Sequence, residues 1–160
     1  MLHLVKIALM LLALVVSDSL SLPITCSKTT LTHTEAWNHM KAFSIGITSS
    51  GGCTDRTKPT CTSLTQVRCA TACALIRYKQ NSGCALTITG GTEVGHSSGT
   101  YSHYNGYKID FSLSTCHSNY ITGKYTRIAD RGDGAKQYKD PRGNIFALEG
   151  NHWDVTFTSC

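Results

Sequence analysis

The sequence has no internal repeat and no low-complexity linker, so we expect a single folded domain. It also has no basic helix and no basic module interleaved with aromatic residues, which argues against a nucleic-acid partner. The charge excess is small, with 15 Lys and Arg residues against 10 Asp and Glu residues. A net charge of +5 keeps a protein soluble and favours adsorption to anionic polymers or cell surfaces.

Long apolar runs are absent beyond the first residues of the chain. There, Lys6 precedes the apolar run Ile7–Val16, and several serine residues follow it. This order is typical of a secretory signal peptide, and the run is shorter than the roughly 20 residues that span a bilayer. We therefore predict a signal peptide at residues 1–21 and one secreted domain at residues 22–160, a monomer with no membrane contact after cleavage. A retained membrane anchor is the alternative.

The pattern C-x-x-C, which is common in thiolate metal sites, does not occur among the eight cysteines. All of them follow the predicted signal peptide: Cys26, Cys53, Cys61, Cys69, Cys73, Cys84, Cys116 and Cys160. An even number of cysteines in a secreted chain predicts four disulfide bonds, formed in an oxidising compartment. The sequence leaves open which cysteines pair.

Helical patterns come early in the chain and strand patterns late. Thr34 is the expected N-cap of a short first helix, and Ser63 and Gln66 form an S-x-x-Q capping box that predicts the start of a second. Alternating apolar and polar residues predict strands at 85–89 and 106–113 and a hairpin at 144–157. This order predicts an α+β fold, in which a small antiparallel sheet follows N-terminal helices and disulfides reinforce the domain.

The segment between the predicted strands is mixed. Residues 119–128 have a helical pattern, and residues 127–144 have the composition of a loop. This loop contains Arg131-Gly132-Asp133, an integrin-type tripeptide. We interpret the tripeptide as coincidental, because glycine-rich loops often contain such combinations.

Several polar residues suggest a metal site on the predicted sheet. His103 stands just before the second predicted strand, and Asp110 lies within it. Gly106 between them allows the chain to bend, so that the imidazole folds back toward the carboxylate. His152, on the polar face of the hairpin, supplies a third ligand, and this set of N and O donors suits Zn²⁺ with one position left for water. Glu149 then lies close enough to act as the general base that takes a proton from this water.

These residues also resemble the motifs of a known family. The stretch "SHYNGYKID" (Ser102–Asp110) is similar to the S-x-H-x-x-G-x-A-x-D motif of zinc D-Ala-D-Ala peptidases, and "EGNHWDV" (Glu149–Val155) resembles their E-x-x-H motif. The family joins lysostaphin-type enzymes, D-Ala-D-Ala peptidases and the hedgehog signalling domain. The resemblance implies a small α+β domain that acts on peptidoglycan stem peptides. It also implies zinc held by His103, Asp110 and His152, with Glu149 as the base.

The chain departs from the family pattern at three points. Ser102 is directly adjacent to His103, Lys108 replaces a small residue, and residues 88–101 contain no arginine that would steady a substrate carboxylate. We expect His96, within that segment, to contact the substrate or act as the electrophile. Without the arginine, cleavage inside a stem peptide is open beside carboxypeptidase cleavage.

Two other functions stay open on the sequence. One is a non-catalytic, zinc-containing binding or signalling module of the hedgehog type, and the other is a cysteine-rich secreted effector whose histidines are incidental. Glu93 lies either behind a metal ligand or in solvent, and we expect the solvated position. His33, His39 and His117 have no partner at a ligand spacing, and we expect them at the surface.

Overall fold

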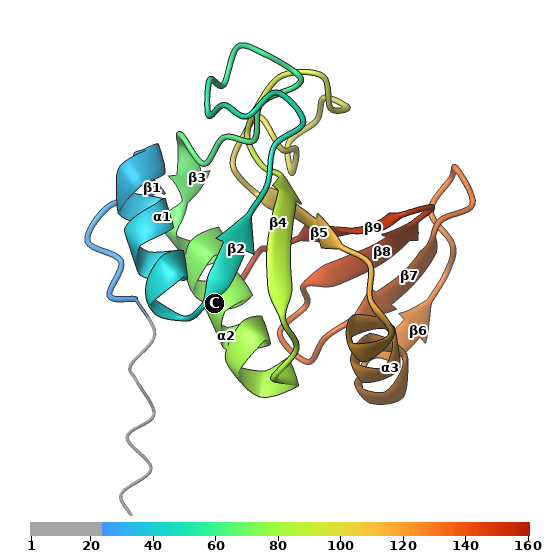
Figure 1. Cartoon of the computed structure of the whole chain (residues 1–160). Helices are drawn as coiled ribbons and strands as arrows, with labels where there is room; N and C mark the ends of the chain where they lie inside the picture. Colours follow the sequence, from blue (N-terminus) through green and yellow to red (C-terminus); the bar gives the residue numbers. More distant parts are fainter. Residues whose placement is uncertain (1–23) are drawn as a thin grey trace, which may run out of the picture.

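The computed structural model describes residues 24–160, so the predicted signal peptide lies outside the described residues. Figure 1 shows the helices beside a long, twisted sheet. The elements in chain order are β1 (Thr30–Leu31), α1 (His33–Ala42), β2 (Ile45–Ile47), β3 (Val67–Arg68), α2 (Cys69–Ser82), β4 (Leu86–Gly90), β5 (Lys108–Ser112), α3 (Thr115–Lys124), β6 (Thr126–Ile128), β7 (Lys136–Lys139), β8 (Ile145–Glu149) and β9 (His152–Thr156).

Seven of the strands form one sheet, in the order β2-β4-β5-β9-β8-β7-β6. The edge strand β2 runs parallel to β4, and the other neighbours are antiparallel. The α+β class is confirmed, but the sheet is larger than the small one predicted. The additional strands are β2 at one edge and β6 and β7 at the other. Strands β6 and β7 are polar and lack the apolar alternation that marks a half-buried strand.

The central strands have one apolar and one polar face, as the alternation predicts. Ile109 and Phe111 of β5 and Trp153 and Val155 of β9 are fully buried, and they pack in one core with apolar residues of all three helices. Because successive side chains of a strand point to opposite faces, the residues between them point away from this core. The polar face is the one that carries the candidate site.

The predicted start of the second helix is wrong. Helix α2 begins at Cys69 because both backbone groups of Ser63 are engaged elsewhere. The Ser63 N–H donates to Glu93 Oε2 at 2.7 Å, and its carbonyl accepts from the Thr92 N–H at 2.7 Å. Gln66 has a φ of 65°, which turns the chain out of the helical path.

The other helix boundaries differ from the prediction by a few residues. Helix α1 is capped by Thr32 rather than Thr34, in a capping box in which Thr32 Oγ1 accepts from the Glu35 N–H and Glu35 Oε2 accepts from the Thr32 N–H. Helix α3 begins at Thr115, where Ser114 provides the cap, and it ends before the predicted boundary because the chain continues as β6.

The prediction of four disulfide bonds is confirmed. The bonds are Cys26–Cys69, Cys53–Cys61, Cys73–Cys160 and Cys84–Cys116. No cysteine in the described part of the chain is free, which is typical of proteins from an oxidising compartment. Within residues 24–160, no helix has the length and apolar character needed to span a bilayer.

Candidate metal centre

Polar side chains of three neighbouring strands form one side of the site. In the ladder between β5 and β9, Asp110 pairs with Asp154, and in the ladder between β8 and β9, Glu149 pairs with His152. Residues directly opposite one another point to the same face of a sheet. These four side chains therefore gather on the face away from the core, and we call them the strand wall.

Residues 91–106, between β4 and β5, form the other side of the site, and we call them the loop wall. Gly90 ends β4 directly against Asp110, where a Cβ would lie 2.6 Å from Asp110 Oδ2. Gly106 has a φ of 76°, and a Cβ there would collide with the backbone of a neighbouring segment. The Gly106 N–H donates to His103 O at 2.8 Å, so the turn folds His103 back toward β5, as the sequence predicts.

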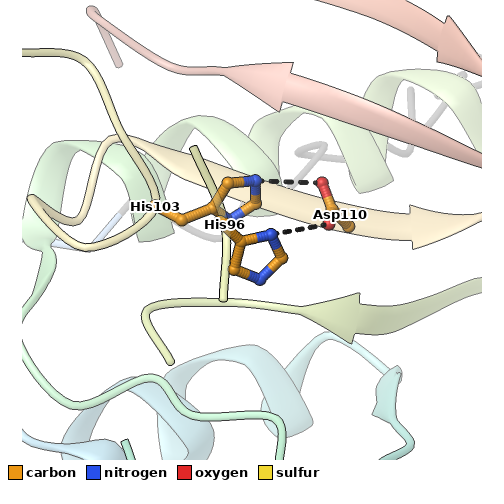
Figure 2. A group of neighbouring side chains, drawn as sticks. All are labelled: His96, His103 and Asp110. Atoms are coloured by element: carbon orange, nitrogen blue, oxygen red, sulfur yellow. Dashed lines mark ion pairs between the residues drawn. The ribbon is translucent and has the colours of Figure 1, made fainter. Parts of the chain in front are cut away.

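Asp110 lies among three imidazole nitrogens, two of which Figure 2 shows. His103 Nε2 lies 3.2 Å from Asp110 Oδ1, and His96 Nδ1 lies 3.9 Å from Asp110 Oδ2. From the strand wall, His152 Nε2 approaches the same Oδ2 at 3.8 Å. Ligand atoms around a tetrahedral zinc ion are about 3.4 Å apart when each lies about 2.1 Å from the metal. The ligand atoms of His96, His103 and Asp110 lie within 4.8 Å of one another, and this group could hold a metal ion.

Each imidazole hydrogen-bonds through its other nitrogen to an oxygen that only accepts. The pairs are His103 Nδ1 with Gly91 O at 2.7 Å, His96 Nε2 with Glu93 Oε1 at 3.1 Å, and His152 Nδ1 with Asn151 Oδ1 at 3.0 Å. Those nitrogens therefore carry the proton, and in the neutral rings the nitrogens that face Asp110 present lone pairs. This is the tautomer and orientation found in histidines that bind metals.

Asp110 lacks the donors that a buried carboxylate needs. Its Oδ1 has no hydrogen-bond partner within residues 24–160, although His103 Nε2 is 3.2 Å away, and Oδ1 of the opposite Asp154 is unpartnered in the same way. Like charges directly opposite one another destabilise a sheet, and a buried charge needs a compensating partner. The unpartnered Asp110 oxygen and the lone pairs of His96 and His103 therefore fit a bound cation.

The rings of His96 and His103 are stacked, with centroids 3.8 Å apart and planes inclined by 15°. Both rings approach Asp110 from the loop wall. The stack also keeps both rings beside Asp110.

Glu93 is buried and anchors the loop wall, so the prediction that it is solvated is wrong. It accepts hydrogen bonds from the backbone N–H groups of Ser63 and Gly91 and from His96 Nε2. Burial raises the pKa of Glu93, but these hydrogen bonds outweigh it and lower the pKa. The bond to Glu93 in turn raises the pKa of His96 above 6.5, against the effect of burial and with help from the charge of Asp110.

The two walls enclose a cleft of about 620 Å³. Its lining residues are Gly95, His96, Ser97, His103, Lys108, Asp110, Arg131, Gly132, Asp133, Glu149, His152 and Asp154. All five residues that the sequence assigned to the site, namely His96, His103, Asp110, Glu149 and His152, are thus brought together. The group whose ligand atoms lie within 4.8 Å of one another contains His96, whereas the sequence predicted His152 as the third ligand. The sequence predicted that His96 would contact the substrate or act as the electrophile.

Two positively charged side chains that the sequence did not assign to the site also reach the cleft. Lys108 Nζ lies 2.6 Å from Asp154 Oδ2, and Arg131 Nη1 donates to the same oxygen at 2.7 Å. Arg131 Nη2 also donates to Glu149 Oε1, which leaves Glu149 Oε2 at 3.7 Å from His152 Nε2. Lys108 was predictable, since it stands two residues before Asp110 on the same strand face. Arg131 carries no local signal.

The other histidines of residues 24–160 lie outside the cleft. His117 is fully buried, so its predicted surface position is wrong. Helix α3 places its ring between two oxygens: Tyr78 Oη lies 2.8 Å from Nδ1, and Ala85 O lies 3.0 Å from Nε2. Burial lowers the pKa of His117. His39 is exposed as predicted, and His33 is half-buried.

No protein-family model, curated protein or solved structure matches this chain. The resemblance to zinc D-Ala-D-Ala peptidases therefore stays a prediction from two short motifs, and the function has to follow from the residues of the chain.

Proposed function

We propose that this chain is a secreted zinc-dependent peptidase that hydrolyses the stem peptides of bacterial peptidoglycan. The observation that carries the proposal is the buried carboxylate of Asp110, which faces three imidazole nitrogens at 3.2 to 3.9 Å beside Glu149. The donor set by itself supports metal-assisted hydrolysis. Peptide bonds and peptidoglycan come from the resemblance, and secretion is supported by the predicted signal peptide and the four disulfides.

We assign His103, Asp110 and His152 as the zinc ligands, because mixed imidazole and carboxylate donors suit this ion. When bound, zinc lowers the pKa of a water molecule to about 7 and polarises a carbonyl group. The acceptors Gly91 O and Asn151 Oδ1 keep the two imidazoles in the required tautomer and orientation.

Glu149 is the general base of this proposal. Its Oε1 is occupied by Arg131, and its Oε2 lies on the side of His152, where a proton can be accepted. A carboxylate in this place takes a proton from the attacking water and returns it to the amine that leaves. The side chain is 32% exposed, so water and a peptide can reach it.

A second function is favoured by the position of His96. Its Nδ1 is 3.9 Å from Asp110 Oδ2, nearly the same distance as His152 Nε2 at 3.8 Å. If both rings bind zinc together with His103 and Asp110, four protein ligands close the coordination sphere, which is typical of structural zinc. The chain would then be a non-catalytic zinc-containing binding or signalling module.

The first experiment measures zinc content by elemental analysis and the release of amino groups from purified peptidoglycan. The proposal predicts one zinc ion per chain and release of amino groups by the wild-type protein. Glu149→Gln should keep its zinc and lose about 100-fold or more in rate, as expected for a general base. A Glu149→Gln variant that hydrolyses at the wild-type rate would contradict this assignment.

His96→Ala separates the two functions. In the peptidase, three ligands remain and the variant keeps zinc, whereas in the closed site it loses a ligand and its zinc affinity falls steeply. A wild-type protein with stoichiometric zinc and no hydrolysis supports the binding module. A protein that binds no zinc would favour the cysteine-rich effector instead.

A further inference from the structure

The tripeptide Arg131-Gly132-Asp133 occupies the tight connection between β6 and β7. The Arg131 N–H donates to Ala135 O at 2.9 Å, and the Gly134 N–H donates to Arg131 O at 2.7 Å. These two bonds fix the backbone of the connection at the rim of the cleft. The Arg131 side chain extends from there to the strand wall.

Every nitrogen of the Arg131 guanidinium is engaged. Nε and Nη2 donate to Asp133, at 2.9 Å to Oδ1 and 2.6 Å to Oδ2. Nη1 donates to Asp154 Oδ2 at 2.7 Å, and Nη2 also donates to Glu149 Oε1. A planar guanidinium held at both ends in this way has little freedom to rotate.

These contacts determine where the Glu149 carboxylate lies. Glu149 is the last residue of β8, and its side chain has several rotatable bonds. With Oε1 held by Arg131, Oε2 is directed to His152 Nε2 at 3.7 Å. The Asp133 carboxylate accepts from the Arg131 guanidinium and the Ala135 N–H, so it acts on the base through Arg131.

We propose that Arg131 and Asp133 are positioning residues that hold Glu149 in place for proton transfer. This inference rests on the proposed peptidase function. It also assigns the integrin-type tripeptide a different use, because Arg131 and Asp133 bind each other and Arg131 points into the cleft. A substrate carboxylate is not the partner of Arg131, since the three nitrogens already donate to protein oxygens.

The test compares Asp133→Asn with Asp130→Asn in the zinc-loaded full chain. In Asp133→Asn, the amide oxygen can still accept from the Ala135 N–H, but the amide group cannot accept both Arg131 bonds. Asp130 is an exposed acid in the same connection, paired with Arg127 outside the cleft, and it is the matched control. Both substitutions remove one negative charge from the same hairpin.

We expect Asp133→Asn to lower kcat about 10-fold and Arg131→Lys about 100-fold, as small displacements of a catalytic group do. KM and zinc affinity should change less than about twofold, and Asp130→Asn should match the wild type. An NMR readout is independent of activity: the Arg131 guanidinium signals should be resolved in the wild type and averaged by rotation in Asp133→Asn.

Equal kcat values for Asp133→Asn and Asp130→Asn would overturn the inference, as would a parallel loss of zinc and activity in Asp133→Asn. Arg131 signals that stay resolved in Asp133→Asn would also overturn it. A wild-type protein that binds zinc and hydrolyses nothing overturns the proposed function first, and the positioning role falls with it. The wild-type assay thus separates the two failures.

Discussion

The strand wall and the loop wall of the cleft are held by different kinds of contact. Strands β5, β8 and β9 fix the strand wall through backbone ladders that run the full length of each strand. The loop wall has no ladder and depends on single contacts: Glu93 accepts the Ser63 and Gly91 N–H groups, and Thr92 Oγ1 donates to Thr65 O at 2.7 Å. One substitution removes such an anchor, whereas a ladder distributes the constraint over many bonds.

The loop wall is supported in turn by the segment that the Cys53–Cys61 disulfide closes. Within this segment, Arg56 Nε donates to Thr92 O at 3.1 Å, and Arg56 O accepts from the Val94 N–H at 2.9 Å. Two of the candidate ligands therefore depend on residues some way back along the chain. We expect substitutions that remove the supports of the loop wall to lower metal affinity. In the strand wall, only substitutions of the ligands themselves should lower it.

The largest effect on zinc affinity should come from Asp110→Asn, which removes the negative charge that faces histidines of both walls. Zinc affinity is expected to fall by more than about 100-fold, a larger loss than those seen for groups behind the ligands. The metal-free protein should instead gain about 1 kcal/mol, because the buried pair with Asp154 is relieved. Competition titration with a zinc chelator and urea unfolding in EDTA measure the two effects. A loss of both zinc affinity and metal-free stability would show that Asp110 is structural.

The next comparison sets Glu93, which holds the Gly91 backbone behind His103, against Asn151, which lies behind His152. Glu93→Gln places an amide N–H₂ against buried donors, so it should lower zinc affinity about 10- to 100-fold and cost about 1–3 kcal/mol in stability. Asn151→Ala should change zinc affinity less than about threefold, because Asn151 is exposed and water can replace its oxygen. Calorimetric titration of both variants checks the order. An equal response would show that the walls do not differ.

The third comparison is between two disulfides, Cys53–Cys61 and Cys84–Cys116. The disulfide whose removal costs less stability should have the larger effect on metal affinity. Replacing Cys53 and Cys61 by Ala should cost about 2.5 kcal/mol, and replacing Cys84 and Cys116 about 3.5 kcal/mol, because the second pair closes a longer loop. Zinc affinity should nevertheless fall several-fold only in the first variant. Thermal unfolding and chelator competition on the same samples test this. A larger loss of affinity in the Cys84 and Cys116 variant would contradict the support described for the loop wall.

The same division explains what the sequence could predict. The sequence could place Asp110, Glu149 and His152 on the polar face of the sheet, because strand alternation fixes which face a side chain occupies, and that rule is local. Gly106 also carried a readable signal, since a bend between His103 and Asp110 requires a residue that accepts a positive φ.

Long-range contacts account for the misses. Ser63 and Gln66 have the spacing of a capping box, but Glu93 and Thr92 engage the Ser63 backbone instead, and no local pattern shows this. The position of Arg131 follows from β7 pairing with β8, although Lys136–Lys139 is too polar to be recognised as a strand. Tertiary contacts outweighed local preference in both places.

The smallest expected effect is a pH dependence of stability that arises from His96 in the loop wall. The bond to Glu93 raises the pKa of His96 above 6.5, so folding favours the protonated ring. Its contribution to stability is complete below pH 6.5 and is lost as the pH rises through the raised pKa of His96. Urea unfolding of metal-free protein at about pH 6 and about pH 8 should show this loss, and His96→Gln should remove it. A protonated His96 ring beside Asp110 repels a bound cation, so zinc affinity should rise over the same pH range in which metal-free stability falls. If both quantities rise together, the proton is not on His96, and Glu93 does not control the loop wall in the way its contacts indicate.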